Sequence, residues 1–107
     1  MTIDGLTPMT KIELVIPTAE VDAVTALMRS IGATGYTALG GVSGFGHHGA
    51  HGGRMLFNDR DALTLLITVV PADRAQTLVD GLRPVLEAGS GVMFVSDTAV
   101  SRPEYFR

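Results

Sequence analysis

The residues best able to do chemistry are concentrated between Gly40 and Gly53, which read GGVSGFGHHGAHGG. This stretch holds seven of the thirteen glycines and all three histidines, His47, His48 and His51. Glycine lets backbone N–H groups approach a ligand closely, and successive N–H groups can form a concave site for an anion. Imidazole titrates near neutral pH and also coordinates metals. The stretch therefore predicts an anion-binding loop, with a flexible connector as the alternative.

Gly44 to Gly49 matches the dinucleotide-binding pattern G-x-G-x-x-G letter for letter. That pattern requires a following helix, whose N-terminus holds the pyrophosphate. Here the next periodic segment is the apolar run Leu63–Val70, which is typical of a buried strand. A Walker-type phosphate loop is excluded as well, because no Gly-Lys-Ser/Thr follows. Both familiar nucleotide motifs are therefore rejected on context.

The histidine cluster also allows a metal-binding hypothesis. His47 and His51 would share a face of a helix, but the glycines around them disfavour helix formation. No Asp or Glu lies inside the cluster, and Asp59 and Asp61 are the nearest carboxylates. A metal-responsive protein that uses His47, His48 and His51 remains the alternative reading.

Composition narrows the class of protein. The 107 residues suit a single domain, and the net charge of −3, with one lysine and seven arginines, argues against a nucleic-acid partner. The absence of cysteine excludes disulfides, thiolate metal sites and a cysteine nucleophile. No serine lies in a nucleophile-elbow setting, so we expect no enzyme activity. With no signal peptide or apolar run of membrane length, we expect a cytoplasmic protein without membrane insertion.

Hydrophobic periodicity predicts the order β-α-β-β-α-β. The expected strands are 11–16, 35–39, 63–70 and 92–95, with a bulge or bend at 40–41. The first helix is expected to be capped by Thr18 and to end at Gly32. The second begins at Pro71 and should kink or end at Pro84. Residues 1–10 are predicted to form an N-terminal tail, and 97–107 show no clear period.

This order predicts an α+β, ferredoxin-like βαββαβ sandwich, in which 11–107 form one domain and both helices cover one face of the sheet. Since the run 63–70 is apolar on both faces, the uncovered face should be buried by self-association. A small ferredoxin-like monooxygenase is the enzymatic rival. It would need a polar pocket between sheet and helices, where this sequence places packed aliphatic residues.

Four motifs follow one another along the chain: GATGYT at 32–37, VSGFG at 42–46, VVPAD at 69–73 and GSGVMFVSD at 89–97. In this order and spacing they resemble the PII signal-transduction superfamily, and the resemblance runs from Lys11 to about Asp97. It implies a ferredoxin-like homotrimer that binds adenine nucleotides in clefts between subunits. It also implies that the glycine-rich loop between strands two and three, the T-loop at about 44–60, engages a target protein.

The resemblance assigns roles to particular residues. Thr37 and Val69 match positions that contact adenine, and Gly44 and Gly46 match the base of the T-loop around the phosphates. Gly89 to Gly91 match a second phosphate loop, and Arg102 and Arg107 lie in the region that supplies basic residues. The full set of implied nucleotide-binding residues is Thr37, Gly44, Phe45, Gly46, His47, Val69, Gly89, Ser90, Gly91, Arg102 and Arg107.

Departures from the family pattern refine the expected ligands. His47-His48 replaces Arg-Gln, and Val92 stands in the place of a phosphate-binding lysine. Loss of a charge-assisted phosphate contact favours ADP or AMP over ATP. The missing glutamine counts against 2-oxoglutarate sensing. The shortened T-loop contains no tyrosine to accept a nucleotidyl group.

The overall pattern is similar to PII-like proteins tied to inorganic-carbon uptake, particularly the carboxysome-associated branch. That resemblance implies bicarbonate as a second regulatory ligand and no cofactor. Gly46, His47, His48 and Arg54 are the expected anion contacts. It also implies a target protein such as a bicarbonate transporter or a carboxysome component.

Overall fold

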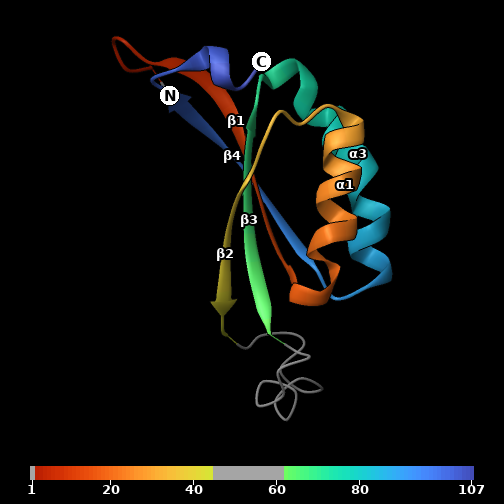
Figure 1. Ribbon diagram of the computed structural model, residues 1–107. Helices are drawn as coiled ribbons and strands as arrows, with labels where there is room; N and C mark the ends of the chain where they lie inside the picture. Colours follow the sequence, from red (N-terminus) through yellow and green to blue (C-terminus); the bar gives the residue numbers. More distant parts are fainter. Residues whose placement is uncertain (1, 45–61) are drawn as a thin grey trace.

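A computed structural model of the chain describes residues 2–44 and 62–107. The element order confirms the predicted β-α-β-β-α-β arrangement, with a short 3-10 turn after the first strand and another near the C-terminus (Figure 1). The elements are β1 (Thr7–Pro17), η1 (Thr18–Glu20), α1 (Val21–Ile31), β2 (Thr37–Val42), β3 (Leu63–Val70), α3 (Ala72–Ala88), β4 (Val92–Val100) and η4 (Pro103–Tyr105).

The four strands form one antiparallel sheet in the order β2-β3-β1-β4. The central strand β1 pairs with β3 from Thr10↔Val70 to Pro17↔Leu63, and with β4 on its other side. Both helices lie on one face of this sheet (Figure 1). The chain therefore has the predicted ferredoxin-like sandwich.

Burial alternates along β1 and β3, which separates the two faces of the sheet. The side chains under the helices form the core, together with the inner faces of α1 and α3. The fully or almost fully buried core residues are Ile12, Leu14, Ile16, Val24, Met28, Leu66, Val70, Leu78, Leu82 and Leu86. Each side chain of this kind contributes about 1.5–3 kcal/mol on burial. This core holds the helices against the sheet and leaves the other face uncovered.

The C-terminal end of α1 agrees with the prediction, whereas its N-terminal end does not. Gly32 adopts a left-handed conformation with φ 117° and its N–H donates to the Met28 carbonyl, so the predicted C-cap is confirmed. The predicted Thr18 cap is wrong, because α1 begins at Val21 after a 3-10 turn. The Thr18 hydroxyl instead shares a 2.8 Å hydrogen bond with the Thr64 hydroxyl, which ties the turn to β3.

The helix α3 runs through Pro84 to Ala88, so the expectation that Pro84 could end it is wrong. A proline removes the bond to the carbonyl four residues earlier, here that of Asp80. Pro84 is exposed, and water can therefore solvate the freed carbonyl. No helix within residues 2–44 and 62–107 has the length and apolarity needed to cross a membrane.

Strand β2 confirms the expected irregularity at residues 40–41. Its pairing with β3 shifts between Leu39 and Val42, and Gly41 has φ 69°, a conformation that favours glycine. The strand begins at Thr37, two residues later than predicted. Its last residue, Val42, leads into Ser43 and Gly44, after which residues 45–61 lie outside the described chain.

Two predictions are wrong in part: residues 1–10 are not wholly a tail, and residues 97–107 are not wholly irregular. Residues Thr7 to Thr10 belong to β1 and pair with Asp97 to Val100, which extend β4. These segments lack a regular apolar alternation: Met9 is the buried apolar side chain of Thr7 to Thr10, and strand pairing with β4 holds the segment in the sheet. The tail therefore ends before Thr7, and β4 is five residues longer than expected.

Candidate functional site

The face of the sheet opposite the helices, here called the open face, is largely apolar. Directly paired residues project to the same side of a sheet, so the strand register defines rows across it. One row reads Leu39, Leu65, Val15, Val92; the next reads Thr37, Ile67, Glu13, Phe94; a third contains Val69, Lys11 and Ser96. Phe94 is 57% exposed and Leu39 is 48% exposed. Large apolar side chains exposed together in this way mark an interaction surface.

The implied nucleotide-binding residues within the described chain lie at two opposite ends of this sheet. Thr37 begins β2, whereas Gly44 lies two residues beyond its last residue, Val42. Seven residues of extended chain span about 20 Å. Gly89 to Gly91 precede β4 and lie at the same end as Gly44, but β2 and β4 form opposite edges of the sheet. Three strand spacings separate these edges, about 14 Å.

The first end, here called the Thr37 end, combines the start of β2 with the end of β3 and the C-terminal turn. Thr37 pairs with Ile67 and therefore shares the open face with Val69. The Thr68 hydroxyl donates a 2.7 Å hydrogen bond to the Gly35 carbonyl, which fixes the chain leading into β2. This end holds the two positions that the family resemblance assigns to adenine.

Arg102 is brought to the Thr37 end by η4. The Thr34 hydroxyl donates a 3.2 Å hydrogen bond to the carbonyl of Tyr105, so the C-terminal turn is fastened to the segment before β2. The C-terminus, with Arg107, lies at the same end of the sheet as the end of β3 (Figure 1). The structure thus brings Thr37, Val69 and the C-terminal arginines to one end.

The second end, here called the glycine end, contains Gly44 and the turn 89–91. Gly89 ends α3, with its N–H donating to the Leu86 carbonyl, and Ser90 is exposed. A Cβ at Gly91 would lie 2.6 Å from Leu86 Cδ2 and 2.9 Å from Ile16 Cγ2. Close packing therefore explains the glycine at 91 without a ligand, a reason that the sequence does not reveal. A Cβ at Gly89 would meet only ordinary contacts, the nearest being Glu20 Oε1 at 3.6 Å.

Several predicted residues lie outside the described chain: Phe45, Gly46, His47, His48, His51 and Arg54. The anion site and the metal alternative therefore stay predictions. Among residues 2–44 and 62–107, no three His, Asp or Glu side chains come close enough to hold a metal.

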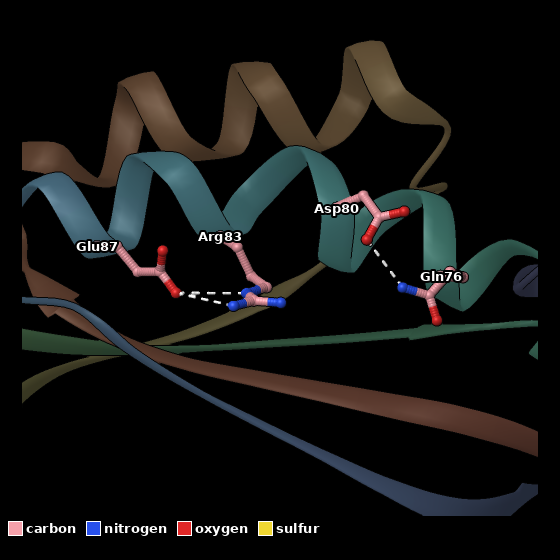
Figure 2. A network of polar contacts seen from close by, with 4 residues as sticks. All are labelled: Gln76, Asp80, Arg83 and Glu87. Atoms are coloured by element: carbon pink, nitrogen blue, oxygen red, sulfur yellow. Dashed lines mark hydrogen bonds and ion pairs between the residues drawn. The ribbon is translucent and has the colours of Figure 1, made fainter.

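Two other surface features are a pocket that borders the Thr37 end and a pair of polar contacts on α3. A pocket of about 380 Å³ lies between α1 and the start of β2, lined by residues that include Arg29, Thr34 and Tyr36. Tyr36 precedes the first residue of β2 and lines this pocket together with Met28 and Arg29 of α1, so it lies beside the helix. The outer face of α3 carries two exposed pairs four residues apart, Gln76–Asp80 at 2.8 Å and Arg83–Glu87 at 3.2 Å (Figure 2). Such pairs support a helix by about 0.2–0.5 kcal/mol each.

Sequence reasoning missed Tyr105 and Thr34. The guanidinium of Arg102 donates a 3.1 Å hydrogen bond from Nη1 to the Tyr105 hydroxyl, and its Cζ lies 5.4 Å from the centre of the Tyr105 ring. The available signal was the Arg-x-x-Tyr spacing, which brings both side chains together only if 102–105 form a 3-10 turn. Because 97–107 showed no periodicity, this turn was not predicted.

Comparison with known proteins agrees with the fold and with the sequence resemblance. The family described as nitrogen regulatory protein P-II matches residues 9–105. A structure of CPII, a nitrogen regulatory PII-like protein from Thiomonas intermedia K12, bound to ADP, AMP and bicarbonate is 40% identical. The match covers 95% of this chain and 96% of that chain, with a TM-score of 0.81.

A second CPII structure, bound to ADP and bicarbonate, is 37% identical over 95% of this chain and 97% of that chain, with a TM-score of 0.80. The ATP complex of GlnK from B. subtilis is 23% identical over 91% of this chain and 85% of that chain, with a TM-score of 0.61, and shares the fold. The comparison with curated proteins returned no significant match. The matched family and the CPII structures establish that this chain belongs to the nitrogen regulatory protein P-II family.

Proposed function

We propose that this protein is a non-enzymatic PII-like regulator. It binds ADP or AMP in clefts between the subunits of a homotrimer, with bicarbonate as a second ligand, and signals through its T-loop to a partner protein. The observation that carries the proposal is the separation of the implied nucleotide-binding residues into the Thr37 end and the glycine end of one sheet.

This separation favours a site between subunits. Thr37 begins β2 and Gly44 lies two residues beyond its end, so about 20 Å of extended chain separates them. The adenine-side group and the phosphate-side group of a single chain therefore lie at opposite ends of the sheet. A neighbouring copy that places its Thr37 end against the glycine end would complete the site. Packing of open faces, with Leu39 and Phe94 exposed in the single chain, supplies the apolar contact for such an assembly.

The preference for ADP or AMP rests on Val92 and on the relatives. Val92 begins β4 directly after the turn 89–91 and is 43% exposed on the open face. Its side chain offers no hydrogen-bond donor where the family resemblance implies a lysine. The CPII structures that this chain resembles at 37–40% identity are bound to ADP, and one of them also to AMP. Both observations support a binding preference for adenine nucleotides with fewer phosphates than ATP.

The first prediction concerns this preference. Calorimetric titration of the purified protein is expected to give dissociation constants for ADP and AMP no weaker than that for ATP. The variant Val92→Lys is expected to strengthen ATP binding relative to ADP by about tenfold, because it adds a charged donor near the terminal phosphate. A wild-type preference for ATP, or no response of ATP affinity to Val92→Lys, would contradict the assignment.

The second prediction is that bicarbonate and ADP bind cooperatively. We propose that the loop from Gly44 to Arg60 couples the two ligands: its glycines are costly to order, so the ligand that orders them first lowers the cost for the second. We propose Gly46, His47, His48 and Arg54 as its bicarbonate contacts. A coupling of about 1–3 kcal/mol is typical, and linkage requires each ligand to tighten the other by the same factor.

The measurement is ADP titration in bicarbonate and in chloride at the same pH and ionic strength, since imidazole groups titrate near neutrality. Reciprocal bicarbonate titration with and without ADP provides the internal check. An ADP dissociation constant that is the same in bicarbonate and in chloride would exclude bicarbonate from the mechanism and leave an adenylate sensor. A bicarbonate transporter or a carboxysome component is the proposed class of target.

A further inference from the structure

The C-terminal turn holds Arg102 in a defined arrangement. Nη1 of Arg102 donates a 3.1 Å hydrogen bond to the Tyr105 hydroxyl, and the guanidinium lies 5.4 Å from the centre of the same ring. The turn itself is closed by the Tyr105 N–H donating to the Arg102 carbonyl at 3.0 Å and by the Phe106 N–H donating to the Pro103 carbonyl at 3.0 Å. One tyrosine therefore fixes both the backbone and the side chain of this arginine.

The turn is also fixed relative to the predicted adenine contacts. The Thr34 hydroxyl donates to the Tyr105 carbonyl across 71 residues of sequence. Thr34 lies three residues before Thr37, in the segment that the Thr68 hydroxyl secures through Gly35. A chain of hydrogen bonds therefore connects the start of β2 to the Arg102 guanidinium.

Arg102 keeps most of its binding capacity in this arrangement. A guanidinium has five N–H donors, and the hydrogen bond to Tyr105 uses one of them. In the described part of the chain the two ion pairs are Lys11–Glu13 and Arg83–Glu87, so no carboxylate there neutralises Arg102. The remaining donors form a planar fork that matches phosphate oxygens.

We propose that Tyr105 is a positioning residue that presents Arg102 to the phosphate groups of the adenylate. This inference rests on the proposed function and deepens it, because it adds to the site a residue that has no assigned role. An exposed arginine normally samples many rotamers and loses that freedom when it binds a ligand. The Tyr105 ring and hydroxyl remove part of this freedom in advance, which strengthens phosphate binding without adding a contact to the ligand.

The test compares ADP with adenosine, which lacks phosphate. Tyr105→Phe removes the hydroxyl and keeps the ring. It is expected to weaken ADP binding about three- to tenfold and to leave adenosine binding unchanged. In an Arg102→Gln background, Tyr105→Phe is expected to have no further effect on ADP, because a positioning residue acts only through the residue that it positions. Thr34→Val removes the hydrogen bond that ties the turn to the segment before β2. Like Tyr105→Phe, it is expected to weaken ADP binding and to leave adenosine binding unchanged.

Tyr36→Phe is the matched control, since Tyr36 is an exposed tyrosine that lines the pocket beside α1. The ADP affinity of this variant should equal that of the wild type. Subunit mass and melting temperature are measured for every variant. Equal losses for ADP and adenosine, or an undiminished effect in the Arg102→Gln background, would show that Tyr105 acts independently of Arg102. Tighter ADP binding by Tyr105→Phe would show that Tyr105 competes with phosphate. Each of these results overturns the inference while leaving adenylate binding intact, whereas a wild-type protein that binds no ADP would overturn the proposed function itself.

Discussion

Replacing Phe94 with glutamate is expected to convert the proposed trimer into a folded monomer that no longer binds ADP. Phe94 lies on the open face in the row of Thr37, Ile67 and Glu13, and it is 57% exposed in the single chain. In the proposed assembly this side chain becomes buried. Burial of an unpaired carboxylate costs on the order of several kcal/mol, and three copies would bear that cost at once.

Val95→Glu provides a matched control on the same strand. Val95 is 51% exposed, similar to Phe94, but it pairs with Ile12 and so lies on the helix side of β4. The control is expected to keep the subunit mass and the ADP affinity of the wild type. Light scattering and ADP calorimetry on both variants show which of the two faces forms the subunit interface. A Phe94→Glu protein with trimer mass and normal ADP binding would show that the open face is not the subunit interface.

Gly91→Ala is expected to destabilise the fold, whereas Gly89→Ala is expected to weaken ADP binding without comparable destabilisation. A methyl group at 91 enters the space of Leu86 and Ile16, two core residues, at 2.6 and 2.9 Å. Overpacking of this kind costs about 1–3 kcal/mol. At 89 the nearest atoms lie 3.6–3.8 Å away, so the methyl group fits and instead narrows the approach of a phosphate to the turn.

Thermal melting at one protein concentration measures the first effect, since about 1 kcal/mol shifts the midpoint of a domain of this size by roughly 4–8 °C. ADP titration measures the second. If Gly91→Ala melts like the wild type, Leu86 and Ile16 yield more readily than the packing indicates. If Gly89→Ala binds ADP normally, the turn 89–91 is not a phosphate contact and its glycines serve packing alone.

The sequence by itself determined most of the fold. Apolar periodicity located α1, α3 and the middle of β1, and a continuous apolar run located β3, because each of these elements buries side chains in the shared core. Gly32 marked the end of α1 and the pair Gly40-Gly41 marked the irregularity in β2, since Gly32 and Gly41 adopt positive φ angles that favour glycine. Together with the PII resemblance, these local signals were sufficient to predict the family and its sandwich.

Only the tertiary structure decided how distant segments meet. The pairing of Thr7–Thr10 with Asp97–Val100 joins the two ends of the chain through backbone hydrogen bonds, which leave no periodic trace in side chains. The same holds for the Thr34 hydrogen bond to Tyr105 and for the packing that requires glycine at 91. The separation of the Thr37 end from the glycine end likewise follows from strand direction and sheet order, because residues close in sequence can lie at opposite ends of an extended strand.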